Sequence, residues 1–239
     1  MMDKNKDVFG TALWEYHQSP HRQELITWTS LTEEDTVPLS YFFRDHDQMP
    51  VLEQKAIELS KGRVLDIGCG AGSHALYLQN QKKIEVVGLD SSSGAIKTAS
   101  SRGLIQTVHQ SIFDYQEGHY DTLLLLMNGT GICGSLHNLK TLLEKLKSLI
   151  HSHGQILLDS SDLIYLFDET PQGEKIIPAS SYYGELEFGI RYQNQTETFP
   201  WLYVDFDLLS HTAHEIGLTA QLICEGKNWD YLARLVREY

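Results

Sequence analysis

The chain has 239 residues, which corresponds to one large domain or two small ones. Its 41% hydrophobic and 21% charged residues are typical of a globular protein and exclude a disordered chain. With 19 basic and 32 acidic side chains the formal net charge is −13, so we expect no nucleic-acid or membrane partner unless a local basic patch supplies one. The sequence leaves the oligomeric state open.

The three cysteines, Cys69, Cys133 and Cys224, are too few and too widely spaced for a disulfide framework or a zinc cluster. Residues 1–7 are polar, and no apolar signal-peptide core follows them. The longest apolar runs, such as residues 123–127, are far shorter than the ~20 residues that a membrane span needs. These features predict a cytoplasmic protein with reduced thiols.

From residue 50 to residue 160, segments of helical and strand character alternate. The hydrophobic patterns predict helices over residues 50–59, 73–80, 92–101 and 136–150, and strands over 63–67, 84–89, 105–110, 120–127 and 154–159. Such alternation indicates an α/β fold with a parallel sheet. We expect a domain over residues 50–239, preceded by a lid or cap over residues 1–49, in which the acidic run 33–35 is a solvated loop.

After residue 160 the pattern changes. Residues 184–192 alternate apolar and polar side chains, 193–195 are typical of a turn, and 197–204 form a return strand. We therefore expect residues 160–204 to be an antiparallel insertion on the main sheet. A helix over 205–216 and strands over 218–224 and 231–236 complete the chain.

The most informative stretch is Val-Leu-Asp-Ile-Gly-Cys-Gly-Ala-Gly-Ser-His at residues 64–74, which joins a predicted strand to a predicted helix. This junction lies at the carboxyl ends of the strands, where open α/β sheets bind their ligands. Gly68, Gly70 and Gly72 allow a tight turn and a close approach of the backbone to a ligand.

Two kinds of ligand compete for this loop. A dinucleotide favours Gly-x-Gly-x-x-Gly, but the third glycine position is Ser73, and the Asp66 carboxylate would repel a nearby pyrophosphate. A cationic ligand without phosphate, such as S-adenosylmethionine, suits Asp66 better. Asp90 ends the next strand, 20 residues beyond Gly70, where a carboxylate accepts hydrogen bonds from ribose hydroxyls.

The Leu-Asp-Ile-Gly-Cys-Gly-x-Gly sequence at residues 65–72, followed by Asp90, resembles the class I S-adenosylmethionine-dependent methyltransferases over residues 50–160. The resemblance implies a Rossmann-like, doubly wound α/β fold with a seven-stranded, mostly parallel sheet whose last strand is antiparallel. It also implies S-adenosyl-L-methionine as the cofactor.

Carried over by position, the resemblance implies further contacts. Ser111 stands where the family often has an aspartate that binds the adenine amine, so Ser111 and Ile112 become the expected adenine contacts. Asn128 and Gly129 would face the methionine end, while Tyr41 and Arg44 would close over the cofactor. The full set of expected cofactor-binding residues is Asp66, Gly68, Cys69, Gly70, Gly72, His74, Asp90, Ser91, Ser111, Ile112, Asn128, Gly129, Tyr41 and Arg44.

The motifs specify the cofactor rather than the acceptor, because a methyl group on sulfonium is already activated and the enzyme chiefly aligns the reactants. A base is needed only where the acceptor must lose a proton. The expected pocket wall comprises Tyr182, Tyr183 and Trp201, and the candidate catalytic residues are Tyr16, His17, His46, Asp159 and Asp162. No metal is expected, because the histidine pairs 151/153 and 211/214 lack further ligands.

The segment Met-Asn-Gly-Thr at residues 127–130 differs from the Asn/Asp-Pro-Pro-aromatic motif of enzymes that methylate nucleic-acid bases. The sequence therefore predicts methyl transfer from S-adenosylmethionine to a small-molecule oxygen, nitrogen or carbon nucleophile. The alternatives are a nicotinamide-dependent oxidoreductase, a protein methyltransferase and a cofactor-binding protein without catalysis.

Overall fold

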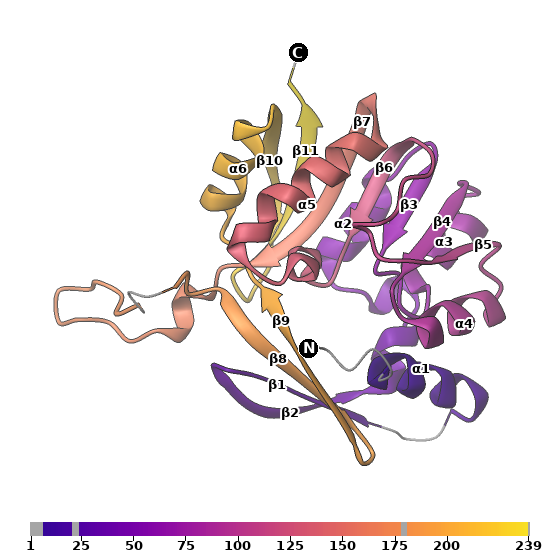
Figure 1. Ribbon diagram of the computed structural model, residues 1–239, viewed down its shortest axis with the longest axis horizontal. Coiled ribbons are helices and arrows are strands. Elements are labelled where there is room, and N and C mark those ends of the chain that lie inside the picture. Colours follow the sequence, from indigo (N-terminus) through magenta and orange to yellow (C-terminus); the bar gives the residue numbers. More distant parts are fainter. Residues whose placement is uncertain (1–6, 21–23, 178–180, 239) are drawn as a thin grey trace.

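The computed structural model describes residues 7–20, 24–177 and 181–238, and it contains two β-sheets (Figure 1). The larger sheet has seven strands in the order β10-β11-β7-β6-β3-β4-β5. Their bounds are β3 Val64–Ile67, β4 Val86–Asp90, β5 Gln106–His109, β6 Tyr120–Leu125, β7 Ile150–Ser161, β10 Leu218–Glu225 and β11 Asp230–Arg237.

The directions of these strands confirm the predicted fold class. Strands β5, β4, β3, β6 and β7 pair in parallel, whereas β11 lies between β10 and β7 and runs antiparallel to both. The antiparallel strand is thus the last in the sequence, as expected. All four residues of β3 are buried, because helices cover both faces of a parallel sheet.

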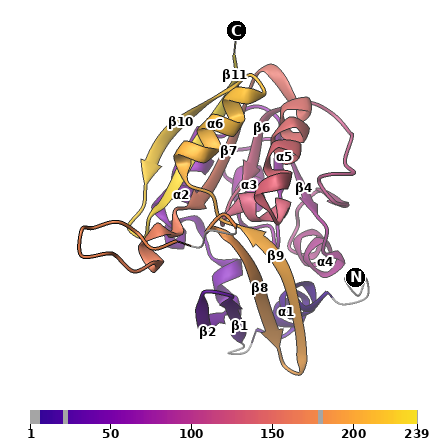
Figure 2. The same cartoon turned by 60° about the vertical axis from the view of Figure 1, so that its left-hand side comes forward.

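Successive strand residues supply two separate cores. Leu123 and Leu125 pack with α5 and α6 on one face, whereas Leu124 and Leu126 pack with α2 and α3 on the other. Figure 2 shows α5 and α6 together on their side of the sheet. The helices are α1 Val8–Gln18, α2 Val51–Leu59, α3 Ser73–Asn80, α4 Ser93–Ser101, α5 Leu136–Leu149 and α6 Phe206–Glu215.

The prediction that residues 160–204 extend the main sheet is wrong. Strands β8 (Glu185–Tyr192) and β9 (Gln195–Leu202) join a separate four-stranded sheet of order β2-β1-β8-β9, with β1 at Glu24–Thr29 and β2 at Thr32–Pro38. The apolar face of β8 draws the hairpin to this separate sheet, because Ile190 and Tyr192 pack with Leu25 and with Val8 and Ala12 of α1. We call this sheet, α1, the 3₁₀ helix η1 (Leu39–Phe43) and the adjoining residues 44 and 203–204 the cap (Figure 1).

Helix α1 is fastened to the main domain at its first turn. The Asp7 carboxylate accepts hydrogen bonds from the backbone N–H of Gly10 in α1 and of Gly94 in α4, both at 2.9 Å, and also from the Ser92 hydroxyl. One side chain therefore caps two helix N-termini. A Cβ on Gly94 would lie 2.4 Å from the backbone of Gly10, so the two helices touch where both lack side chains.

Two other elements differ from the predictions. Residues 33–35 lie in β2 rather than in a loop, because pairing with β1 gives this exposed strand its hydrogen bonds. Glu34 there forms an ion pair with Arg191 of β8. Strand β7 begins at Ile150, where a helix end was expected. Among the described residues, no helix has the length and apolar character needed to cross a membrane.

Candidate functional site

The glycine loop joins β3 to α3 at the carboxyl edge of the main sheet. Gly68, Gly70 and Gly72 have φ values of +73°, +54° and +82°, a region that side-chain-bearing residues rarely adopt. Arg102 supports the loop from outside, since its Nη1 donates to the Ala71 carbonyl oxygen at 2.6 Å. The loop therefore presents bare backbone at the edge where ligands bind.

Asp90 is fastened to the tip of this loop. Its Oδ2 accepts the Gly70 N–H at 2.9 Å, and its Oδ1 accepts the Ser92 N–H at 2.8 Å. Burial raises the pKa of Asp90, although these two hydrogen bonds oppose the shift. The end of β4 and the glycine loop thus form one rigid corner with a carboxylate at its centre.

Asp66 lies beneath the loop and is 1% exposed. Burial raises its pKa to about 6. Its Oδ2 has no hydrogen-bond partner among the described residues. A buried carboxylate oxygen without a donor is costly, so this atom is matched to a ligand that brings a donor or a positive charge.

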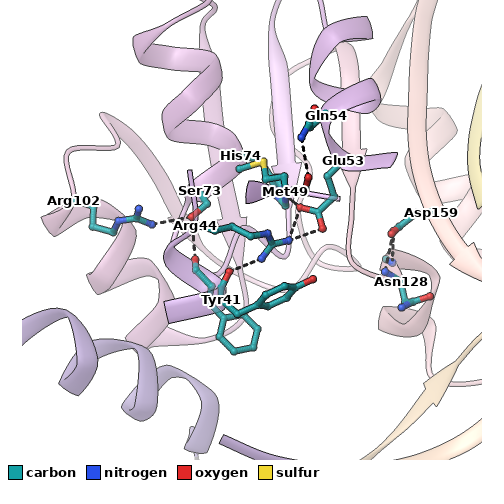
Figure 3. A network of polar contacts seen from close by, with 12 residues as sticks. Tyr41, Arg44, Met49, Glu53, Gln54, Ser73, His74, Arg102, Asn128 and Asp159 are labelled. Atoms are coloured by element: carbon teal, nitrogen blue, oxygen red, sulfur yellow. Dashed lines mark hydrogen bonds and ion pairs between the residues drawn. The ribbon is translucent and has the colours of Figure 1, made fainter. Parts of the chain in front are cut away.

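A chain of buried ionic contacts connects the cap to the glycine loop (Figure 3). Arg44, which follows η1, donates from Nη2 to both Glu53 carboxylate oxygens at 2.5 Å and from Nη1 to the Tyr41 carbonyl oxygen. Glu53, on α2, also accepts a 2.6 Å hydrogen bond from His74 Nε2 on α3. All three ionic side chains are buried, and the Arg44 Nε is left without a partner.

The ionisation states of Arg44, Glu53 and His74 depend on one another. Burial alone would lower the pKa of His74, but the hydrogen bond to Glu53 and the charge of Asp66 raise it. Burial alone would raise the pKa of Glu53. The hydrogen bond and the charge of His74, together with Arg44, outweigh this effect, so the pKa of Glu53 is lowered. Glu53 is therefore the carboxylate that the two cations hold ionised.

Asp159 lies across the site, on β7, where it fixes the segment after β6. Its Oδ1 accepts the backbone N–H of Asn128 at 2.8 Å and of Gly129 at 3.4 Å. Asn128 has a φ of +58°, which turns the chain sharply away from the strand. Burial raises the pKa of Asp159 to about 7, and the negative charge of Glu53 adds to this shift.

Two tyrosines of the cap lie within electrostatic reach of Asp159. The charges of Glu53 and Asp159 contribute to the raised pKa of Tyr41, whose main cause is burial, and Figure 3 shows its ring directed toward Asp159. Burial raises the pKa of Tyr203, just beyond β9, to about 12, with a further contribution from Asp159. Tyrosines from both parts of the cap thus converge on one carboxylate.

Trp201 packs against the main domain rather than forming an open wall. A Cβ on Gly131 would lie 1.8 Å from the Trp201 indole, so this glycine is required for contact between β9 and the 3₁₀ helix η3 (Gly129–Cys133). The Thr130 hydroxyl lies 3.1 Å from the Leu202 carbonyl oxygen and 2.9 Å from the Ser160 hydroxyl. The cap is therefore joined to the sheet beside Asn128 and Asp159.

The expected adenine contacts follow β5 and face the same edge. Ile112 is buried in the core beneath the sheet, and the Ser111 hydroxyl accepts the Phe113 N–H at 3.3 Å. Ser91 is exposed beside Asp90. Cys69 is buried, which raises the pKa of its thiol well above the usual value and makes it a poor nucleophile.

Three of the candidate catalytic residues lie elsewhere. Tyr16 packs on Phe43, and His17 hydrogen-bonds Ser101 at the end of α4 remote from Asp90. His46 stacks on Tyr77 in a surface groove between α2 and α3. No contact places these side chains beside Asp159, and their catalytic role stays a prediction.

The tyrosines 182 and 183 hold the start of β8 in place. The Tyr183 hydroxyl donates to Asp162 at 2.7 Å, and the Tyr182 hydroxyl donates to Asp205 at 2.6 Å. Asp162 Oδ1 also accepts the Ile164 N–H, so in Asp159 and in Asp162 alike one carboxylate oxygen is bound locally. Asp159 is the more buried of the two and holds the backbone that follows β6, which makes it the stronger candidate for a role in the chemistry.

Comparison with known proteins decides what this site binds. A family model described as a methyltransferase domain matches residues 64–154. The chain is 38% identical to an S-adenosylmethionine-dependent methyltransferase from Bacteroides fragilis, determined in complex with S-adenosyl-L-homocysteine, with a TM-score of 0.89 over 98% of this chain and 96% of the other. The chain belongs to the S-adenosylmethionine-dependent methyltransferases.

More distant structures share the fold of this methyltransferase. The sugar N-methyltransferase KedS8 from Streptoalloteichus is 12% identical, with a TM-score of 0.56 over 83% of this chain and 88% of that one. DesVI from Streptomyces venezuelae is 13% identical, with a TM-score of 0.56 over 83% and 92%. A search of curated proteins found no match.

The residues of the site fit S-adenosylmethionine. Its amino-acid end carries an ammonium and a carboxylate, and the site contains a buried acceptor and a buried donor without partners, the Asp66 Oδ2 and the Arg44 Nε. Membership of the family settles the competition between this cofactor and a nicotinamide dinucleotide in favour of S-adenosylmethionine.

Sequence reasoning missed Glu53 and Tyr203 as members of the site. Glu53 had a visible signal, because it is a charged residue beside Leu52 and Ala56 on the buried side of α2. Buried charges are uncommon without a partner, so its position pointed to a cation nearby. Tyr203 had no such signal, since an aromatic residue at a strand end is equally typical of a core.

Proposed function

We propose that this methyltransferase transfers the methyl group to a small-molecule nucleophile. The observation that carries the proposal is the enclosure of the reacting edge by the cap. Asp159 is 8% exposed and Arg44 7% exposed, and Thr130 and Ser160 bond to the chain around residues 202–204. A small molecule reaches such a covered edge more readily than a folded protein or a nucleic-acid strand does, and the net charge of −13 disfavours a nucleic acid further.

We assign the cofactor contacts from the geometry around the loop. Asp90 would accept the ribose hydroxyls, because two backbone N–H groups hold its carboxylate at the end of β4. Asp66 and Arg44 would bind the ammonium and the carboxylate of the amino-acid end. Ser111 and Ile112 stay the expected adenine contacts.

When bound, S-adenosylmethionine supplies a methyl group on a positively charged sulfur. The protein's main contribution is alignment, which is worth ~7–11 kcal/mol of the barrier in well-oriented reactions. Asn128 and Gly129, fixed by Asp159, form the backbone at the end of β6 against which the acceptor and the methyl group would be positioned.

The test of small-molecule transfer uses S-adenosylmethionine with a ¹³C-labelled methyl group. The full-length enzyme is incubated with a deproteinised small-molecule extract, with a protein fraction and with nucleic acid, each separately. We expect label in the small-molecule fraction and production of S-adenosylhomocysteine there. Label confined to the protein or nucleic-acid fraction would contradict the proposal.

The cofactor assignment is tested with Asp90→Ala. Loss of charge-assisted hydrogen bonds to the ribose should weaken S-adenosylhomocysteine binding by roughly 1.5–3 kcal/mol in isothermal titration. Thr219→Ala, on β10 at the opposite margin of the sheet, is the matched control and should bind normally. Unchanged affinity in Asp90→Ala would remove the ribose assignment.

A further inference from the structure

We propose that the acceptor is a protonated amine, which Asp159 binds as an ammonium ion and deprotonates before the methyl group is transferred. This inference rests on the proposed function, because it assumes a small-molecule acceptor. It adds the chemical class of that acceptor and a role for one carboxylate in the reaction.

The first observation is the geometry of Asp159. Its Oδ1 is saturated by the N–H groups of Asn128 and Gly129, which fix the direction of the carboxylate. Its Oδ2 receives no hydrogen bond from any residue in the described part of the chain, and the side chain is more than nine-tenths buried. One oxygen is therefore structural and the other is free to accept a donor from a ligand.

The second observation is the balance of buried charge around the cofactor edge. Buried carboxylates outnumber buried cations by one when the imidazole is protonated and by two when it is neutral. The carboxylates are Glu53, Asp66 and Asp159, and the cations are Arg44 and His74, while the half-buried Asp90 and Arg102 add one charge of each sign. Bound S-adenosylmethionine adds a net charge of about +1, so a negative excess remains in the buried site when His74 is neutral. A cationic acceptor offsets this excess, whereas a carboxylate or phosphate would increase it.

The buried negative charge of the site also disfavours oxygen and carbon acceptors. An alcohol, a phenol or an activated carbon reacts as an anion, or close to one, after losing its proton. Forming an anion beside Glu53, Asp66 and Asp159 is opposed by repulsion between like charges. An ammonium ion instead becomes a neutral amine, so the reacting nitrogen never carries negative charge.

The ionisation of Asp159 suits this task. Burial raises its pKa to about 7, so the carboxylate both binds a cation and takes up a proton near neutral pH. The groups that face it come from every neighbouring element: Glu53 of α2, His74 of α3, Tyr41 of η1, Tyr203 beyond β9 and Tyr231 of β11. Only His74 among them is a cation, so the field at Asp159 stays negative.

The proposed step balances in atoms and charge. Asp159 takes one proton from the ammonium, and the nitrogen lone pair then forms a bond to the methyl carbon. The carbon–sulfur bond breaks, and its electron pair stays on sulfur to give neutral S-adenosylhomocysteine. The product leaves as a methylated ammonium ion, and Asp159 releases the proton that it took to solvent.

The first experiment locates the transferred methyl group. The enzyme is incubated with the ¹³C-methyl cofactor and the deproteinised extract, and the labelled products are analysed by carbon NMR and mass spectrometry. Label on an amine nitrogen supports the inference. Label on oxygen, carbon or sulfur of a small molecule overturns it while leaving the proposed function intact, and label in no small molecule overturns both.

The second experiment uses Asp159→Asn with the labelled acceptor once it is purified. The asparagine carbonyl oxygen still accepts the Asn128 and Gly129 N–H groups, so the fold and the binding of S-adenosylhomocysteine should change less than about threefold. Loss of the base should lower kcat/KM by ~10²-fold or more. Asp168→Asn, an exposed aspartate beyond the site, removes the same charge and should behave as wild type.

The pH dependence separates a base from a structural residue. Raising the pH toward the pKa of the acceptor amine delivers more of it already deprotonated, so the deficit of Asp159→Asn should shrink. A purely structural role predicts the same deficit at every pH. A constant deficit, or a kcat/KM within threefold of wild type near pH 7, would overturn the inference.

Discussion

At the scale of single residues, ionisable side chains without partners are the most informative feature of this site. Asp66 and Asp90 could be identified from the sequence, because each ends a predicted strand next to a glycine-rich turn. The cofactor contact expected of Arg44 stays a prediction, and the structure shows that its guanidinium is shared with Glu53 while its Nε has no partner among the described residues. Such sharing depends on distances between helices that no local pattern encodes.

Asp66 should make the stability of the ligand-free enzyme depend on pH. Its pKa of about 6 lies above the ~3.9 of an unfolded chain, so the folded state holds the proton more tightly. The stabilisation is fully present below pH ~4 and is lost as the pH rises through about 6. Asp66→Asn removes this dependence, and its unfolding free energy relative to wild type should rise by ~2–3 kcal/mol between acidic and neutral pH.

Urea denaturation of both proteins without cofactor, at a series of pH values, measures this difference. The decisive quantity is how the difference in unfolding free energy between Asp66→Asn and wild type changes with pH. Any packing cost of asparagine is the same at every pH and does not contribute to this change. A difference that is constant across the series would show that Asp66 titrates normally. Asp114→Asn, at an exposed aspartate, is the control and should show no such trend.

At the scale of elements, the parallel core could be predicted and the cap could not. Residues 123–127 are continuously apolar, which is typical of a strand covered on both faces, and the helices between such strands have clear amphipathic spacing. Strand β2 is almost entirely exposed, with the sequence Thr-Glu-Glu-Asp-Thr-Val-Pro, and gives no periodic signal. Its strand character comes from pairing with β1, which is a tertiary contact.

The difference between local pattern and tertiary contact also explains why residues 184–204 were wrongly placed on the main sheet. Their alternating pattern correctly predicted a hairpin with one apolar face, but alternation does not say which surface covers that face. The cover is α1, which lies about 170 residues earlier in the chain. Only the apolar side chains of both segments together specify this pairing.

The attachment of α1 by a shared cap gives a prediction at this scale. Asp7→Ala removes the acceptor for the N–H groups of Gly10 and Gly94, and should lower the unfolding free energy by ~0.5–2 kcal/mol. Asp7→Asn keeps a side-chain oxygen at the cap and should lose much less. Chemical denaturation measures both, and an Asp7→Ala variant as stable as wild type would show that packing alone holds α1.

At the scale of the whole molecule, the enzyme consists of a cofactor-binding domain and a cap built from two distant segments. Residues 7–20, 24–44 and 184–204 share one sheet and one small core, so each segment supplies part of the structure of the other. The cap touches the site at three places: Tyr41 and Arg44 from the first segment, and the chain near Tyr203 from the second. Because β1 pairs with β8, any movement of the cap should involve both of its segments as a unit.

Hydrogen exchange tests this cooperation. S-adenosylhomocysteine should engage Arg44 and slow amide exchange in residues 24–29 of β1, and because β1 pairs with β8, exchange in residues 185–192 should slow to a similar degree. Strand β10, at the far margin of the main sheet, is the internal reference and should change little. Protection limited to the glycine loop, with β1 and β8 unaffected, would mean that the cap is not coupled to the cofactor. Protection of β1 without β8 would mean that the two halves of the cap open separately, despite the antiparallel pairing of β1 with β8.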